Sequence, residues 1–308
     1  MINVLRGRIR SGGRVIVLGT FDGVHLGHQA LIRAGREIAA AERVPLRVYT
    51  FDVHPLSVVA PEQAPALLTT LEEKRDRIEA CGAEELRILK FTSATADLPP
   101  DVFLDRLREE CEIRAVVAGW NYTFGRSGAG NAETLRRDGQ RYGYRVEIVP
   151  SVRTRDGDII SSTAIRGKLR AGDLAGANAM LGAPYPLSGT VTGGKHLGTR
   201  LTVATANVAV PPDKLLPAYG VYSCFMTCGG ETLPAVVNIG LQPTLPSGEV
   251  TVEAHLLDGA PDLYGREVRL TLTHFLRRER KFDSVEALKA QIGEDIRMAR
   301  KLTETPGN

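Results

Sequence analysis

The sequence predicts an α/β protein in which a doubly wound parallel sheet is followed by a C-terminal antiparallel β-barrel and a terminal helix. In the first half, short apolar runs alternate with segments of helical periodicity, a pattern typical of parallel strands covered by helices on both faces. Near residues 181–186 two prolines and a glycine mark a domain boundary. Beyond it, short strand-like runs are broken by Gly and Pro, as in antiparallel barrels.

The elements of the first half follow one another as strand and helix. We expect strands at 14–18, 46–50, 85–91, 115–119 and 145–149, and helices at 28–41, 71–81, 101–111, 131–142 and 165–171. Ligands of such sheets bind outside the carboxyl ends of the strands. The site is therefore expected in the loops that follow the strands.

The second half is expected to form the barrel. Strands are predicted at 187–191, 201–208, 221–227, 235–239, 250–257 and 267–273. A stripe of apolar residues from Val285 to Ala299, spaced three or four apart, predicts the terminal helix. The predicted domains are 1–183 and 184–308.

The composition limits the class of protein. The chain of 308 residues is 43% hydrophobic and 24% charged, which excludes a disordered protein. Its net charge of +3 is too small to predict binding to nucleic acid or to an acidic membrane. We see no apolar run near the ~20 residues of a membrane span, and no signal peptide. Four cysteines without a C-x-x-C pair predict neither disulfides nor zinc. We expect a cytoplasmic protein with no nucleic-acid or membrane partner.

Residues 19–28, GTFDGVHLGH, form the strongest motif, because they leave the end of the first strand and enter a helix. The free N–H groups and positive dipole of a helix start bind anions, and glycines let the backbone approach a ligand. His25 and His28 are three residues apart, so both can face one phosphate and donate hydrogen bonds to it. A single histidine is more often structural. The pair at this turn favours phosphate binding.

Residues 160–166, ISSTAIR, place three adjacent hydroxyls before a predicted helix. Taken alone, the segment is more simply a helix cap. Together with the histidine pair it favours a second anion clamp, in which the hydroxyls hold a leaving pyrophosphate and Arg166 neutralises its charge. His54 follows the second strand, so we expect it near the same crevice.

These motifs suit phosphoryl chemistry at an α-phosphate. An attacking phosphate is already ionised at neutral pH, so the reaction requires no general base. The site needs only to align the reactants and stabilise charge. The sequence contains no G-x-S-x-G nucleophile elbow.

Four strings carry a family resemblance: LGTFDGVHLGH at 18–28, TFDVHP at 50–55, GWNYTFG at 119–125 and ISSTAIR at 160–166. With them the chain resembles the bacterial bifunctional riboflavin kinase/FMN adenylyltransferase (FAD synthetase) family over nearly its whole length. The resemblance implies a nucleotidyltransferase-like Rossmann domain that joins FMN to the AMP of ATP, giving FAD and pyrophosphate. It also implies a barrel that phosphorylates riboflavin.

The resemblance implies site residues as well. The ATP phosphates would be held by Gly19, Phe21, Asp22, Gly23, His25, Gly27, His28, Ser161, Ser162, Thr163 and Arg166. Asp22 would orient the loop, and His25 and His28 would be catalytic. The flavin would contact His54, Asn121, Phe124 and Gly125. Ala164 stands where the family has Arg and Val53 where it has Pro, but the phosphate-facing residues remain.

Phosphate transfer to a primary hydroxyl needs a general base and Mg²⁺, because an alcohol is a poor nucleophile. Glu253 is the candidate base, although without the resemblance it is more simply a solvated carboxylate. Thr205 and Asn207 are candidate Mg²⁺ ligands and keep the Thr and Asn of the family's G-F-P-T-A-N string. Residues 202–204, Thr-Val-Ala, replace Gly-Phe-Pro, so the nucleotide loop is expected to be reshaped.

Alternatives stay open at this point. One is a monofunctional FMN adenylyltransferase whose barrel is inactive or accepts a modified flavin. Another is a non-catalytic flavin- or nucleotide-binding regulator, which a two-sided clamp on a triphosphate disfavours. Adenylyl transfer to a different small phosphate shares the histidine motif but leaves GWNYTFG and the barrel unexplained. The expected small-molecule partners are riboflavin, FMN and ATP, and the sequence does not determine the oligomeric state.

Overall fold

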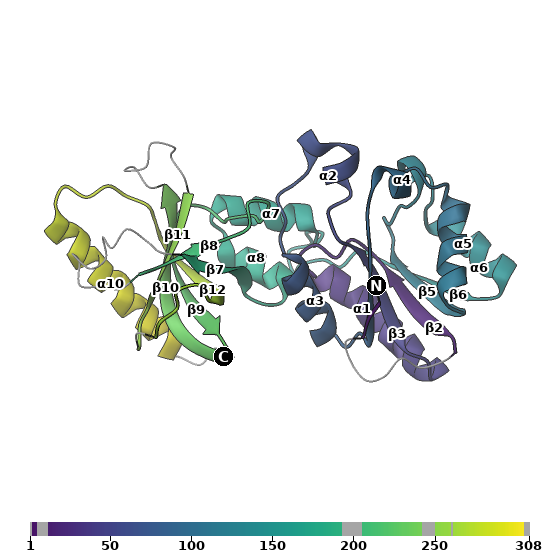
Figure 1. The fold of residues 1–308 in the computed structure, drawn as a ribbon, viewed down its shortest axis with the longest axis horizontal. Helices are drawn as coiled ribbons and strands as arrows, with labels where there is room; N and C mark the ends of the chain where they lie inside the picture. The colour runs from purple at the N-terminus through teal and green to yellow at the C-terminus, as the bar shows by residue number, and fades with distance from the viewer. Residues whose placement is uncertain (1, 5–11, 193–204, 242–249, 260, 305–308) are drawn as a thin grey trace. The chain divides into compact units, whose positions relative to one another are not determined.

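The structure is a computed structural model that describes residues 2–4, 12–192, 205–241, 250–259 and 261–304 (Figure 1). The chain divides into two compact units, residues 1–162 and 163–308. Each unit has its own sheet. Within the described part of the chain, no helix combines the length and the apolar character that crossing a bilayer requires.

The first unit is built on a six-stranded sheet with the order β1-β4-β3-β2-β5-β6. Its strands are β1 (Ile2–Val4), β2 (Arg14–Leu18), β3 (Leu46–Phe51), β4 (Glu85–Leu89), β5 (Ile113–Gly119) and β6 (Arg145–Val149). The pairs from β4 through β6 are parallel, which confirms the predicted doubly wound sheet. β1, which the sequence analysis missed, adds an antiparallel edge on β4.

Helices cover both faces of this sheet. They are α1 (Leu26–Glu42), α2 (Leu56–Val59), α3 (Leu71–Ala80), α4 (Ser93–Ala96), α5 (Pro100–Glu110) and α6 (Ala132–Tyr142), with short 3-10 turns at Pro61–Gln63 and Arg126–Gly128. Val15 and Val17 of β2 pack in one core cluster with residues of α1 and α3. Ile16 and Leu18 pack in a second cluster with residues of α5 and α6. Because β2 is buried on both faces, its sequence is apolar from Val15 to Leu18, and the buried Arg14 is paired with Glu85.

The second unit is a closed antiparallel barrel with the order β10-β11-β8-β7-β12-β9, as predicted. Its strands are β7 (Tyr185–Thr192), β8 (Ala206–Ala209), β9 (Gly220–Cys228), β10 (Glu231–Leu241), β11 (Val250–Leu256) and β12 (Glu267–Arg278). Of the predicted strand 201–208, residues 201–204 lie outside the described residues. The same holds for the replaced segment 202–204, so its reshaping stays a prediction.

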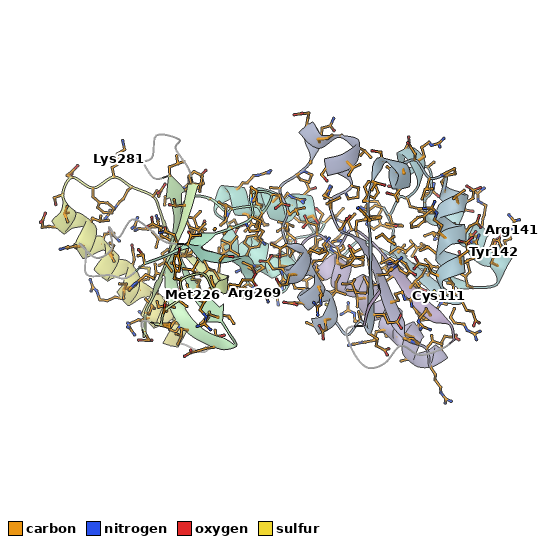
Figure 2. The ribbon with its side chains drawn as sticks, viewed as in Figure 1. Cys111, Arg141, Tyr142, Met226, Arg269 and Lys281 are labelled. Atoms are coloured by element: carbon orange, nitrogen blue, oxygen red, sulfur yellow. The ribbon has the colours of Figure 1, made fainter. Side chains whose placement is uncertain are left out.

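The terminal helix α10 (Val285–Glu304) lies against β9 and β10 on the outside of the barrel (Figure 1). Ala299 of α10 packs with Val221 and Val236 in a small core cluster. The barrel strands carry both buried and half-buried residues. Met226 on β9 is buried and Arg269 on β12 is half-buried, and Figure 2 labels both. The barrel thus packs side chains on its inner face and beneath α10.

Two helices precede the barrel. α7 (Ser162–Ala171) begins three residues earlier than predicted, and α8 (Leu174–Leu181) was not predicted. The Ala218 N–H donates to the Leu169 carbonyl of α7 (2.9 Å), and the Asn178 amide of α8 donates to the Leu272 carbonyl of β12 (3.1 Å). Both helices therefore pack with the barrel, whereas the functional boundary after Ala183 stays a prediction.

Candidate functional site

The loop between β2 and α1 has an unusual backbone. Phe21, Gly23 and Val24 adopt positive φ angles of 52°, 85° and 42°. Positive φ is costly for a β-branched residue such as Val24 and persists only where the surroundings enforce it. Phe21 and Val24 are both 0% exposed, so core packing fixes this conformation. The loop is thus a rigid turn at the carboxyl end of the central strand.

Hydrogen bonds from distant residues hold the same loop. The buried Asp22 Oδ1 accepts from the backbone N–H groups of Leu68 (2.9 Å) and Thr69 (3.2 Å). The Gly23 N–H donates to Thr69 Oγ1 at 3.0 Å. The Thr50 hydroxyl donates to the Thr20 carbonyl at 2.9 Å. Asp22 therefore orients the loop, the role expected for it.

The two histidines of the motif lie together at the start of α1. His25 is the N-cap, and its Nδ1 accepts from the His28 backbone N–H at 3.3 Å. The two rings are stacked, with centroids 3.8 Å apart. His25 therefore performs the helix-capping task that serine or aspartate usually performs. This structural role does not prevent its other nitrogen from meeting a ligand.

His28 is held neutral. Burial, and then the neighbouring charges of His25 and Lys74, keep the pKa of His28 well below its ordinary value. Its Nδ1 is buried and has no hydrogen-bond partner among the described residues. A buried nitrogen without a partner is uncommon and calls for a ligand or water. An uncharged donor-acceptor at a helix start matches the expected phosphate contact.

The glycines of the motif leave room for these rings. A Cβ at Gly27 would stand 3.0 Å from the His25 ring and 3.6 Å from the Ile160 carbonyl. A Cβ at Gly19 would stand 2.8 Å from the Phe21 ring. Both glycines are therefore required for close packing, and their predicted contact with ATP stays a prediction.

The second motif meets the first. The Ser162 hydroxyl donates to the Asp22 carbonyl at 2.9 Å, across 140 positions of sequence. The Ile160 carbonyl faces Gly27, as the Cβ distance above shows. Residues 160–162 therefore lie against the loop that carries the histidines. Ser161 is half-buried in the same stretch. Thr163 and the buried Arg166 follow in α7, within the second unit, and their phosphate contacts stay a prediction.

The loops after β3 and β5 flank this turn, because both strands neighbour β2. His54 lies in the loop after β3, where its Nδ1 accepts from the Leu56 N–H at 3.2 Å. Asn121 is exposed just beyond β5. Gly125 has a positive φ of 72° and abuts Pro100, which favours glycine there. These positions fit the predicted crevice.

Phe124 is placed differently from the other predicted flavin contacts. It is 6% exposed and packs in a core cluster, with ring centroids 5.4 Å from Phe103 and 5.8 Å from Tyr122. Its described contacts account for its burial without a ligand. Its flavin contact stays a prediction.

The barrel carries a separate polar row. Glu253 on β11 lies directly opposite Asn207 on β8 and opposite Asn238 on β10. Side chains directly opposite in an antiparallel pair lie within reach of one another. Val252 and Ala254, the neighbours of Glu253 on β11, are buried in the barrel core. Because successive side chains of a strand point to opposite faces, Glu253 lies on the other face, between the two amides. Thr205 is exposed, two residues before Asn207.

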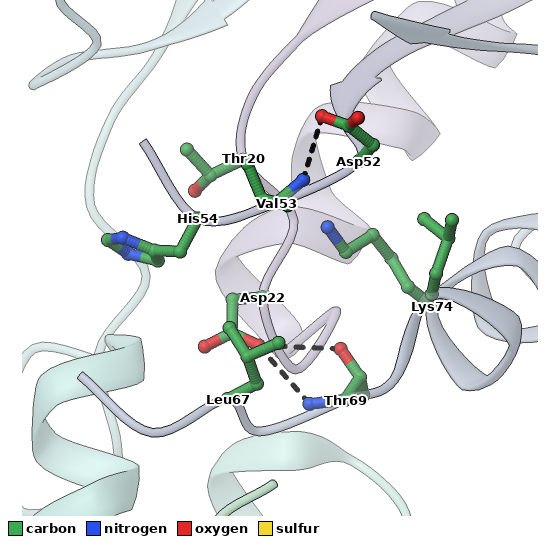
Figure 3. Close-up of a pocket in the computed structure, with 9 residues that line it drawn as sticks. Thr20, Asp22, Asp52, Val53, His54, Leu67, Thr69 and Lys74 are labelled. Carbon is green, nitrogen blue, oxygen red and sulfur yellow. Dashed lines mark hydrogen bonds between the residues drawn. The ribbon is translucent and has the colours of Figure 1, made fainter. Parts of the chain in front are cut away.

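Sequence reasoning did not select Asn238, Thr69 or Lys74 as site residues. The register of β10 and β11 reveals Asn238, and the hydrogen bonds to Asp22 and Gly23 reveal Thr69. Lys74 lines a pocket beside the loop (Figure 3). No local sequence signal marked these three residues, because each is brought to its place by strand register or by tertiary contacts.

Among the described residues there is no group of three or more His, Cys, Asp or Glu side chains that could hold a metal ion. The candidate Mg²⁺ ligands Thr205 and Asn207 are neutral oxygen donors. Mg²⁺ usually keeps several waters and shares substrate phosphates, so a small neutral donor set fits it.

The fold and the two clusters define a class: an α/β domain with a rigid, histidine-bearing turn, followed by a β-barrel domain that carries a carboxylate between two amides. Comparisons with known proteins agree with this division. Residues 9–164 match the FAD synthetase family model, and residues 181–303 match the riboflavin kinase family model.

Curated relatives match nearly the whole chain under the name bifunctional riboflavin kinase/FMN adenylyltransferase. The protein from Listeria monocytogenes is 36% identical, over 92% of this chain and 90% of its own length. That from Escherichia coli K12 is 36% identical, over 94% and 92%. The Bacillus subtilis protein is 35% identical, over 91% and 90%. The chain belongs to the bifunctional riboflavin kinase/FMN adenylyltransferase family, as the resemblance predicted.

A solved structure also matches along the chain. A crystal structure described as a macrolide-efflux protein from Streptococcus pneumoniae has a TM-score of 0.85 and 31% sequence identity. The match covers 96% of this chain and 97% of that chain. Its two-domain architecture is therefore the same as the one described above.

The lowered pKa of His28 predicts a pH dependence of stability. Unfolding restores the ordinary pKa of about 6.5, so below that pH the unfolded chain binds a proton that the folded chain does not. Stability contributed by neutral His28 is complete above about pH 6.5 and falls as the pH drops further, by at most about 1.4 kcal/mol per pH unit.

Urea unfolding of the first unit between pH 7.5 and 5.0 measures this slope. We expect His28→Gln to have a shallower slope than the wild type, with His54→Gln, at a half-buried histidine of the same unit, as the control for loss of an imidazole. Equal slopes in the wild type and His28→Gln would contradict the placement of a buried, neutral His28.

Proposed function

We propose that this chain makes flavin cofactors by two successive reactions: phosphorylation of riboflavin to FMN by ATP, and adenylylation of FMN by ATP to FAD. The observation that carries the proposal is the contact between the two motifs, where Ser162 bonds the Asp22 carbonyl of the histidine loop. Family models for both activities, on separate parts of the chain, support it. The substrates are small molecules, and we expect them to be handled in the cytoplasm.

Adenylyl transfer belongs to the first unit. An oxygen of the FMN phosphate attacks the α-phosphorus of ATP, a new P–O bond forms, and the bond to the β-phosphate breaks to release pyrophosphate. The attacking phosphate is already ionised, so no side chain has to remove a proton. Catalysis consists of alignment and charge stabilisation.

The described residues suit that task. The start of α1 offers free N–H groups to the phosphates. His28, neutral and with an unpartnered nitrogen, adds a donor or acceptor without a charge. Ser161 and Ser162 form the second side of the clamp on the leaving pyrophosphate, and Thr163 and Arg166, which follow them in the chain, stay predicted phosphate contacts. His54, Asn121 and Gly125 line the flavin side.

Phosphorylation belongs to the barrel. Glu253 takes the proton of the riboflavin primary hydroxyl as its oxygen attacks the γ-phosphorus of ATP, and ADP leaves. The two amides opposite Glu253, Asn207 and Asn238, orient the carboxylate. Thr205 and Asn207 would hold Mg²⁺, which when bound neutralises charge on the ATP phosphates.

The alternatives receive less support. If the barrel of an adenylyltransferase were inactive, the carboxylate between two amides would have no function there. A non-catalytic regulator would not need separate polar sites on each unit. Chromatography of the products from riboflavin plus ATP and from FMN plus ATP, each with Mg²⁺, separates the three. We expect FMN and FAD from the first mixture and FAD from the second.

His28→Ala should slow FAD formation from FMN by about 100-fold, because it removes one stabilising contact on the transferring phosphate. The assay is chromatographic; riboflavin phosphorylation by the same variant is the control for the barrel, and urea unfolding is the control for correct folding of the first unit. Wild-type FAD formation by folded His28→Ala would contradict the assigned role.

Glu253→Ala should abolish FMN formation from riboflavin, because no other base is proposed for the hydroxyl proton. FAD formation from added FMN should persist in this variant. Glu267→Ala, an exposed carboxylate on β12, is the matched control. FMN formation at the wild-type rate by Glu253→Ala would remove Glu253 as the base.

A further inference from the structure

A pocket that is partly open to solvent lies beside the histidine loop in the first unit (Figure 3). Its lining combines residues from three segments: Thr20 after β2, Asp52 and His54 after β3, and Thr69 and Lys74 around the start of α3.

Lys74 contributes the cation of this pocket. Its side chain reaches from α3 toward the loop that carries Val53 and His54 (Figure 3). The residue is 7% exposed, and Nζ makes a single hydrogen bond among the described residues, to the Phe51 carbonyl at 3.3 Å. An ammonium has three donors. Two N–H groups of Lys74 are therefore left for a ligand or for water.

The two acidic residues of the pocket have other tasks. Asp52 Oδ1 accepts from the N–H groups of Val53 (3.0 Å) and Phe91 (2.9 Å). Asp22 Oδ1 accepts from Leu68 and Thr69, as described above. Neither carboxylate forms an ion pair with Lys74 within hydrogen-bonding distance. Burial lowers the pKa of Lys74, and the charges of Asp22 and Asp52 oppose that change. The carboxylates thus fix the loops and favour the charged ammonium.

We propose that Lys74 binds the phosphate of FMN, the group that attacks in adenylyl transfer; this inference rests on the proposed function. The reaction brings two anionic phosphates together, so a fixed cation on the acceptor side offsets their repulsion. The ATP phosphates are assigned to the start of α1 and residues 160–162. Lys74 approaches from the side of β3, where its partner is the Phe51 carbonyl and where His54 is the expected flavin contact.

Lys74 thereby makes the site selective for a phosphorylated flavin. Riboflavin lacks the phosphate and gains nothing from the ammonium, whereas FMN gains a charge-assisted hydrogen bond. A structural lysine that only tied α3 to β3 would affect both flavins equally. This difference separates the two roles experimentally.

The test measures FAD formation with FMN and ATP varied separately, in Lys74→Met, Lys74→Arg and the wild type. We expect Lys74→Met to raise the KM for FMN by about 10-fold or more, as loss of one charged hydrogen bond does, with little change in the KM for ATP. Lys74→Arg, which keeps the charge, should recover part of the loss. Lys90→Met, at the other lysine of this unit's described residues and exposed, is the matched control.

A second measurement distinguishes loss of the phosphate contact from general damage to the fold. Riboflavin inhibition of FAD formation is compared in the Glu253→Ala background, where riboflavin is not consumed. An unchanged inhibition constant for riboflavin, together with the raised KM for FMN, supports the proposal. An unchanged KM for FMN, a raised KM for ATP alone, or equal weakening of both flavins would overturn it. Failure of the wild type to make FAD would instead refute the proposed function.

Discussion

The fixed conformation of the turn between β2 and α1 is the constraint on which the rest of the site depends. Two non-glycine residues, Phe21 and Val24, hold positive φ angles in full burial. Asp22 fastens the turn to the start of α3 through its side chain and to Ser162 through its carbonyl. Without these contacts the helix start, the histidine pair and residues 160–162 would have no common geometry. The turn thus connects packing of the sheet to the placement of phosphate donors.

The electrostatics of the first unit follow from that geometry. Burial of His28 disfavours its charged form, because a charge there loses hydration. The neighbouring charges of His25 and Lys74 add repulsion and keep His28 neutral. The unit therefore separates its roles: permanent charge comes from Lys74, and uncharged hydrogen bonding comes from His28. This division suits a reaction between two phosphates, because more fixed positive charge would also bind the anionic product and slow its release.

Much of the fold was predictable from the sequence, because buried parallel strands contain short apolar runs, such as residues 15–18 of β2, and α10 has a clear apolar stripe. The misses have physical causes. β1 has three residues, too few for a period, and α8 contains Gly176 and Asn178, which are poor helix formers stabilised here by the Asp173 cap and barrel packing.

The site was predictable where a local string carried it, as for His25 and His28. The other candidate residues are brought to the site by tertiary contacts, which the sequence does not show. Nothing in the string around Thr69 or Lys74 shows that α3 returns to the histidine loop, and Asn238 is linked to Glu253 only by strand register. Phe124 shows the opposite case, in which a motif residue packs in the core. Sequence patterns thus predicted the chemistry, and the fold placed further residues beside the predicted site.

The claim that the histidine motif and residues 160–162 form one phosphate site can be measured most directly by a double-mutant cycle. The cycle compares kcat/KM for FAD formation in His28→Ala, Ser162→Ala and the double variant. Residues that share a network couple by roughly 0.5–3 kcal/mol, and our account predicts coupling of at least about 1 kcal/mol. Losses that add to within about 0.5 kcal/mol would show that the two segments act independently.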